Sequence, residues 1–456
     1  MELQLRNIGM IKEADIILDG LTLIAGENDT GKSTVGKALY SVVAGLNNSE
    51  KHYDNFITKQ LDTNIFNLKK LVENYFIDEI KNKKNDIIQD MIYNSINKKV
   101  GIDEKDIKIL IENNKNKLIS NLLCIDDYFY NNLSYSINII KNIIDNIKKY
   151  NIHSKEIDKE TKAIINKLNN ANIDRNQKKI ISIFAQLNIE FGTNLIRINS
   201  DNAIIKLIDK NETIMDINID KKYEIKYNND IKEILIDNIT YPIDINIFDN
   251  LLIPYNRDSD IGKDIESHII DFQNKINKYK ELKNNYNSKL NDYIKSIING
   301  NIEYTDNYID FSYVKNNNYF ELINVSSGIK SFSIIDLLLK AGIFNDKHIL
   351  ILDEPEVHLH PKWQIEYAKL MVKIAEEFDI KILINSHSPY FIEAIQKYSE
   401  KSEKIADKTN FYLSEKQDDG YAVIKNVNND IESIYKTLAD AYRKLDKDTL
   451  WNESEK

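Results

Sequence analysis

The sequence predicts an α/β fold whose head is split between the two ends of the chain, with an antiparallel β subdomain and a helical, partly coiled-coil insertion. Three observations support this. An apolar run at 21–25 leads through a glycine-rich loop into an apolar helix at 34–43. Two further apolar runs, at 348–352 and 380–384, each end in polar residues. Between these ends the chain has a long stretch with few glycines and no proline, which favours helix.

The glycine-rich loop, residues 26–33, fits the phosphate-loop pattern G-x-x-x-x-G-K-[ST] at every fixed position. Glycines let consecutive backbone N–H groups turn toward phosphate oxygens, and the following helix adds the positive end of its dipole. Lys32 is expected to face the β- and γ-phosphates, and Ser33 to offer its hydroxyl to Mg²⁺. The pattern predicts ATP and Mg²⁺ as cofactors, with the nucleotide bound by Gly26, Glu27, Asn28, Asp29, Thr30, Gly31, Lys32, Ser33 and Thr34.

Two acids follow the apolar run at 348–352, as in a Walker B strand. Asp353 is expected to hold Mg²⁺ together with Ser33. Glu354 is expected to be catalytic, polarising the attacking water as a general base. A strand ending in a solvated Asp-Glu turn is the plainer alternative, and the phosphate loop argues against it.

His387 stands at the tip of the next apolar run, and Pro389 begins a new element. Parallel strands separated by helices bring their carboxyl ends to one edge, where ligands bind in open α/β sheets. We therefore expect His387 to reach the γ-phosphate as a second catalytic residue.

Ser326, Ser327 and Gly328 precede an apolar helix at 329–339. A hydroxyl, a glycine and helix N-terminal amides can together bind an anion. The same three residues can also be an ordinary N-cap.

In the middle of the chain the sequence predicts both helices and antiparallel strands. Isoleucines at 137, 140, 144 and 147 lie on one helix face, and the runs 195–198, 203–208 and 223–227 alternate as antiparallel strands do. Apolar residues from 265 to 297 then keep a 4-3 spacing, which fits either a coiled-coil arm or a long helix packed on a domain. The predicted parts are 1–50 (N-terminal head with the phosphate loop), 51–190 (helical insertion), 191–255 (β subdomain), 256–300 (helical arm) and 301–456 (C-terminal head).

Composition limits the class of protein. The chain has 456 residues, 42% hydrophobic and 29% charged, with a formal net charge of −10, which argues against indiscriminate coating of DNA. One cysteine, Cys124, excludes an intrachain disulfide and a cysteine-based zinc site. Neither a signal peptide nor a run of about 18 apolar residues is found, so we expect a cytoplasmic protein with no membrane partner.

In this order, the motifs resemble those of non-transporter ATP-binding-cassette (ABC) ATPases, such as the structural-maintenance-of-chromosomes (SMC), RecF and overcoming-lysogenisation-defect (OLD) proteins. The strings D-E-P-E-V-H-L-H-P from Asp353 and S-H-S-P from Ser386 are the most specific. They are most similar to the AAA/OLD-like ATPases of bacterial anti-phage operons, including retron-associated, Septu and PARIS ATPases. The resemblance covers roughly 1–45 and 320–435.

The resemblance implies that Ser326, Ser327 and Gly328 form a signature turn, which contacts the γ-phosphate bound by a second head. The expected partners are a second copy of the chain, in a homodimer or higher homo-oligomer, and a separate effector such as a nuclease or toxin. Ser327 and Ile329 depart from the transporter signature L-S-G-G-Q. About 65 residues follow Pro389, too few for the nuclease domain of OLD proteins; a hairpin around 418–420 and a helix at 431–445 are expected there.

The function expected from this resemblance is that of a sensor ATPase in phage defence, hydrolysing ATP between two heads. Two alternatives remain at the level of sequence. One is an SMC- or RecF-like ATPase that clamps DNA, and the other is a scaffold that binds ATP with little turnover.

Overall fold

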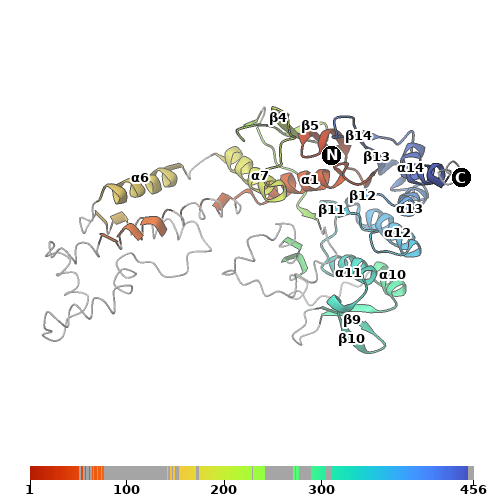
Figure 1. Ribbon diagram of the computed structural model, residues 1–456. Helices are drawn as coiled ribbons and strands as arrows, with labels where there is room; N and C mark the ends of the chain where they lie inside the picture. The colour runs from red at the N-terminus through yellow and green to blue at the C-terminus, as the bar shows by residue number, and fades with distance from the viewer. Residues whose placement is uncertain are drawn as a thin grey trace. The chain divides into compact units, whose positions relative to one another are not determined.

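The computed structural model (Figure 1) describes residues 1–50, 154–170, 174–227, 230–241, 289–304 and 311–449, with scattered positions in 53–75, 141–148 and 271–276. The chain divides into two compact units, Met1–Asn48 with Ser182–Lys456, and Ser49–Ile181. We call the first unit the head. The five-part division expected from sequence stays a prediction.

Five parallel strands form the middle and one end of the head sheet, in the spatial order β13-β3-β12-β11-β7. Their bounds are β3 (Leu21–Gly26), β7 (Asn238–Thr240), β11 (His348–Asp353), β12 (Lys381–Ser386) and β13 (Thr409–Lys416). β3, β11 and β12 are the three apolar runs of the sequence, and their continuous burial is typical of parallel strands covered on both faces. The prediction of these strands is confirmed.

The rest of the sheet is mostly antiparallel and continues from the parallel strands without a break. Within the described residues one 11-stranded sheet runs β6-β5-β4-β1-β2-β14-β13-β3-β12-β11-β7. The added strands are β1 (Glu2–Ile8), β2 (Ile11–Ile17), β4 (Asn202–Asp209), β5 (Glu212–Asp220), β6 (Ile225–Tyr227) and β14 (Ala422–Asn426). The antiparallel β subdomain expected from sequence is thus joined to the head through the β1–β4 pairing.

One strand prediction was wrong. Residues 195–198 make only an isolated bridge, between Ile196 and Ile8. The chain turns immediately afterwards, with Ser200 N donating to Arg197 O and Asn199 at a φ of 66°. Alternation of apolar and polar residues fits a segment that touches a strand once as well as a full strand, so the pattern could not separate the two cases.

Helices α1 (Lys32–Asn47), α12 (Pro361–Phe378) and α14 (Glu432–Thr449) contact the sheet. The other helices with residues in the head are α7 (Arg175–Phe191), which begins in the second unit, α10 (Lys289–Ile298), α11 (Ser327–Lys340) and α13 (Pro389–Ser399). α12 and α13 both begin with proline in the first turn, where the missing N–H costs no hydrogen bond, and the His360 and Ser388 side chains accept bonds as N-caps. The hairpin β13–β14 and helix α14 confirm the C-terminal elements expected from sequence.

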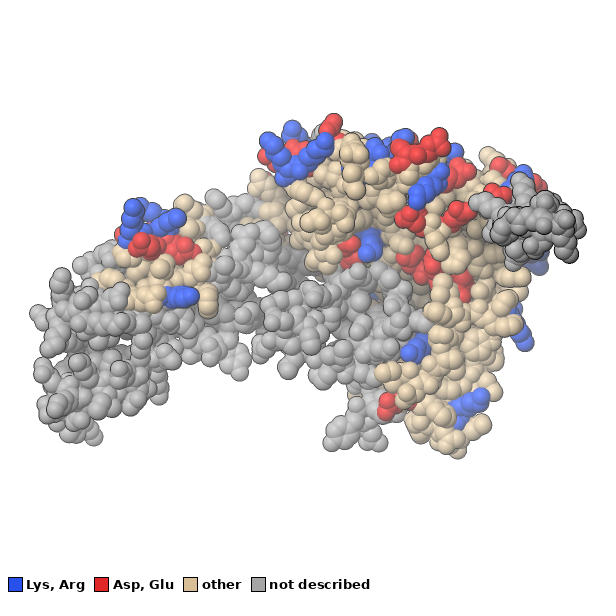
Figure 2. Space-filling view, in the orientation of Figure 1, with Lys and Arg blue, Asp and Glu red and all other residues tan. Residues whose placement is uncertain are grey.

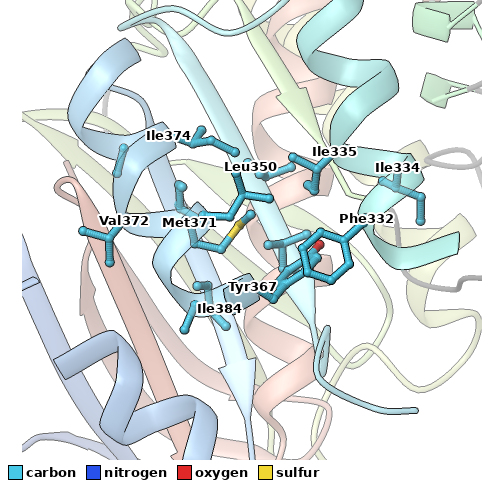
Figure 3. Packing of buried hydrophobic residues seen from close by; sticks show 14 of the residues in the cluster. Phe332, Ile334, Ile335, Leu350, Tyr367, Met371, Val372, Ile374 and Ile384 are labelled. Carbon is cyan, nitrogen blue, oxygen red and sulfur yellow. The ribbon is translucent and has the colours of Figure 1, made fainter. Parts of the chain in front are cut away.

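The core joins the first turns of α11 to α12 and the sheet (Figure 3). Phe332 is fully buried and meets the Tyr367 ring edge-on, with centroids 5.0 Å apart. Leu350 of β11 and Met371 of α12 are also fully buried in this cluster. Complete burial of one such side chain stabilises the fold by about 1.5–3 kcal/mol.

A small second sheet precedes α11 and was not expected from sequence. It has the order β10-β9-β8, with β8 (Asn301–Tyr304), β9 (Phe311–Lys315) and β10 (Asn318–Glu321), all antiparallel. A 3-10 turn (Leu322–Asn324) connects it to α11, and another (Ala406–Lys408) precedes β13.

In the second unit the described residues include α6 (Lys155–Asn170). Ile144 and Ile147 are buried, as the helix-face prediction requires, while positions 137 and 140 lie outside the described residues. Of the arm heptad, Phe272, Ile276 and Leu290 are buried in the head core. Most of the other heptad positions lie outside the described residues, and the coiled coil stays a prediction.

Two surface properties concern possible partners. On the face in Figure 2, basic and acidic side chains of the described residues are interspersed, and no single basic patch is visible among them. No helix in the described part of the chain combines the length and apolarity that a membrane crossing requires.

His348, at the start of β11, makes the head sensitive to acid. It is fully buried, and burial lowers its pKa to about 3, with a smaller contribution from the nearby Lys275. In the unfolded chain a histidine has its ordinary pKa of about 6.5, so the unfolded state binds the extra proton between these two values. The free energy of unfolding should therefore fall as the pH drops from 6.5 toward 3, by at most about 1.4 kcal/mol per pH unit.

We expect His348→Asn, whose amide can still donate toward Ile343 O, to flatten this dependence. The measurement is chemical denaturation of both proteins at several pH values. An equal slope in the two proteins would contradict this origin of the acid sensitivity.

Candidate nucleotide site

The phosphate loop lies between β3 and α1, and its glycines are required by its geometry. Gly31 has a left-handed φ of 80°, and a Cβ there would come 3.0 Å from Ile11 Cγ1. At Gly26, with a φ of 156°, a Cβ would lie 2.6 Å from Ser414 O. A side chain at either position would strain the loop, because it needs both the unusual backbone angle and the close approach.

Strand β13 supports this loop from the side. Ser414 is buried and donates through Oγ to Thr30 O at 2.6 Å, and Thr30 Oγ1 donates to Glu27 O at 2.8 Å. At the exposed edge Lys416 pairs with Asp29 at 2.7 Å. Sequence reasoning missed Ser414 and Lys416; the one available signal was that polar residues follow the apolar stretch 411–413 of this strand.

A cavity of about 530 Å³ lies in front of the loop, and we call it the cavity hereafter. Its lining includes the stretch from Asn28 to Thr34, together with Asp353 and Glu354. Segments more than 300 residues apart in sequence thus meet at one place. Sequence reasoning assigned none of the eight other lining residues to the site, which are Met10, Ser331, Ile334, Leu352, Pro355, Val357, His358 and Tyr367.

Lys32 is held inside the head, 4% exposed, and its ammonium group is well coordinated. It donates to Gly26 O at 3.0 Å and Glu27 O at 2.7 Å, and lies 3.7 Å from Glu354 Oε1. Burial lowers the pKa of Lys32, and the Glu354 carboxylate opposes that shift. The result is a cation next to the anion-binding loop.

Glu354 and His387 form a pair at the ends of neighbouring strands. His387 Nδ1 lies 3.1 Å from Glu354 Oε1. The close contact between the ring and the carboxylate raises the pKa of His387 and lowers that of Glu354. A deprotonated carboxylate in reach of the cavity has the charge state that a general base needs.

Asp353 is oriented by two donors, one for each oxygen. Asn385 Nδ2 donates to Oδ1 at 3.0 Å, and Tyr241 OH donates to Oδ2 at 3.3 Å. Tyr241 follows the three-residue strand β7, is fully buried, and was not found by sequence reasoning. The donor set fits Mg²⁺, because Asp353 and Ser33 both line the cavity and offer the oxygen ligands that this ion prefers. Among the described residues no group of three or more His, Cys, Asp or Glu could hold a metal.

The turn Ser326–Gly328 begins α11. Gly328 is packed so closely that a Cβ would lie 2.9 Å from the Trp363 ring, whereas Ser326 is exposed and its side chain makes no capping bond. None of the three residues is among those that line the cavity of the same chain.

Comparison with solved structures finds SMC heads, at low similarity. The SMC head bound to the C-terminal winged-helix domain of ScpA is 11% identical over 95% of this chain and 98% of that one, with a TM-score of 0.42. The SMC head of Thermotoga maritima is 11% identical over 94% and 98%, with a TM-score of 0.37. The head with an extended coiled coil from Pyrococcus furiosus is 10% identical over 97% and 98%, with a TM-score of 0.28.

A search of curated proteins finds no match. A family model does match, that of the AAA ATPase domain (AAA_15), over residues 1–392 of the 456. That span includes the phosphate loop, Asp353, Glu354 and His387. The chain therefore belongs to the AAA ATPase domain family and is an ATPase.

Proposed function

We propose that two copies of this ATPase bind ATP between their heads, each copy supplying half of every site. The observation that supports this is that the turn Ser326–Gly328 is outside the lining of the cavity, although Ser331, one helical turn further along α11, lines it together with the phosphate loop. An exposed hydroxyl at a helix N-terminus is suited to an anion presented by another molecule. A second head would complete the site.

Within each site the residues divide the work. The loop amides and Lys32 would hold the phosphates, Ser33 and Asp353 would hold Mg²⁺, and Glu354 would accept a proton from the attacking water. His387 positions Glu354 and reaches toward the γ-phosphate. Bound Mg²⁺ would neutralise charge on the phosphate oxygens.

We further propose that the protein is cytoplasmic and serves as the regulatory ATPase of an anti-phage system, acting with a separate effector. The D-E-P-E-V-H-L-H-P and S-H-S-P strings support this role through their resemblance to defence ATPases. Phage challenge of cells carrying the gene with its neighbours tests it, with the Lys32→Ala gene as the comparison. Protection that is equal with both genes would contradict the role, and turnover stimulated strongly by DNA would favour a DNA-clamping ATPase instead.

We expect Lys32→Ala to abolish ATP binding or nearly so, since it removes the buried cation that faces the phosphates. Titration with a fluorescent ATP analogue measures the affinity. Lys397→Ala is the control, because Lys397 is exposed and pairs with Glu393 on its own helix. Unchanged affinity in Lys32→Ala would refute the assignment of the loop.

We expect Glu354→Gln to bind ATP but to turn it over more slowly, by roughly 10²-fold or more, because the amide cannot take the proton. Steady-state phosphate release and nucleotide affinity should be measured on the same preparation. Turnover at the wild-type rate would remove Glu354 from catalysis.

The slow Glu354→Gln variant should also accumulate the paired heads. With ATP and Mg²⁺ its mass by light scattering should rise, and adding Ser326→Arg should prevent the rise while each head still binds ATP through its own phosphate loop. Ser296→Arg, on the exposed face of α10, is the matched control. A mass that does not respond to ATP would contradict the two-headed site.

A further inference from the structure

Glu356 lies two residues after Glu354 and is almost completely buried, with 2% of its surface exposed. Its Oε1 atom accepts three hydrogen bonds from the segment Ser386–Ser388, which we call the switch segment. The donors are Ser386 Oγ at 2.5 Å, His387 N at 3.1 Å and Ser388 N at 3.3 Å. One carboxylate oxygen thus fixes the backbone on which the His387 ring is mounted.

These bonds continue the pairing of two strands beyond their ends. In the register of β11 and β12, Asp353 lies opposite Asn385, and Glu354 N then donates to Asn385 O at 2.9 Å. Past that point the carboxylate of Glu356 replaces the backbone as acceptor. Two glutamates therefore contact the same histidine. Glu356 accepts a hydrogen bond from the backbone N–H of His387, and Glu354 lies against its ring.

Burying the Glu356 carboxylate costs more free energy than packing alone would justify. Burial raises the pKa of Glu356, and among the described residues its Oε2 atom has no hydrogen-bond partner. A buried carboxylate is more expensive than an apolar side chain of similar volume unless its bonds are needed. Because all three bonds go to the switch segment, we infer that they fix the position of that segment.

Gln364 of α12 adds further hydrogen bonds to the switch segment; we call Glu356 and Gln364 together the clamp. Its Nε2 donates to Leu359 O at 3.0 Å and Glu356 O at 3.3 Å, and its Oε1 accepts from Ser388 Oγ at 2.6 Å. The loop from β11 to α12, which includes the cavity-lining His358, is in this way tied to the switch segment.

We propose that Glu356 is a positioning residue for ATP hydrolysis, holding the switch segment so that the His387 ring stays against Glu354. This inference rests on the role of His387 proposed above. Glu356 itself touches neither the reacting phosphate nor the attacking water.

Steady-state kinetics and nucleotide titration of Glu356→Ala and Glu356→Gln test the inference. The alanine variant should lose about 10- to 100-fold in kcat, because a displaced catalytic group is no longer aligned, while KM and ATP affinity change little. The glutamine variant keeps an acceptor oxygen and should recover kcat to within about 5-fold of wild type. Equal kcat in the alanine variant and wild type would overturn the inference.

A double-mutant cycle separates this inference from the function on which it rests. If Glu356 acts through His387, adding Glu356→Ala to His387→Ala should reduce kcat no further. If His387→Ala is slow and Glu356→Ala lowers its kcat further by the full factor, the role of Glu356 is overturned but that of His387 is not. Wild-type turnover in His387→Ala would overturn the role of His387 and this inference with it.

Two further variants test whether a loss of kcat comes only from removing a buried charge or from any change on α12. Gln364→Leu loosens the same clamp without removing a buried charge, and it should also lower kcat unless His387 is already alanine. Glu376→Ala is the matched control, because this carboxylate lies on the same helix as Gln364, accepts from Ser402 Oγ at 3.1 Å and does not line the cavity. A loss of kcat in the control equal to that in Glu356→Ala would contradict the specific role.

Discussion

The head depends on the register of three neighbouring parallel strands. Ser386 of β12 lies opposite Ala25 of β3, and Asp353 of β11 lies opposite Asn385 of β12. Because the strands are parallel and in step, the phosphate loop, the two acids and His387 emerge together at one edge. A shift of one residue in any of these pairings would turn a polar tip to the opposite face of the sheet, and these residues would no longer meet at one edge.

Sequence reasoning reached the elements whose residues carry a strong local pattern. The apolar runs that became β3, β11 and β12 are strands buried at nearly every position, and the loop pattern is fixed by chemistry at each glycine. It did not reach Tyr241 or Ser414. Tyr241 follows a strand of three residues, which is too short to show any period, and Ser414 acts through a partner 384 residues away. Such long-range contacts depend on the topology of the fold, which cannot be read from a single sequence.

The same limit explains the small sheet β8–β10 and the misread segment 195–198. In both places the local pattern is weak and tertiary pairing decides the outcome. Glu356 is an intermediate case. It belongs to a string that sequence analysis singled out, but only the structure reveals that its carboxylate binds the backbone of His387 rather than a ligand.

The bond from Ser414 to the Thr30 carbonyl has a consequence for biosynthesis. The two residues are 384 positions apart, so the loop near the start of the chain lacks its lateral support until β13 has left the ribosome. Domains generally fold from the N-terminus during synthesis, at about 5–20 residues per second, so this loop waits unsupported for roughly 20–80 s. The phosphate loop therefore gains its lateral support late, when the two halves of the head join.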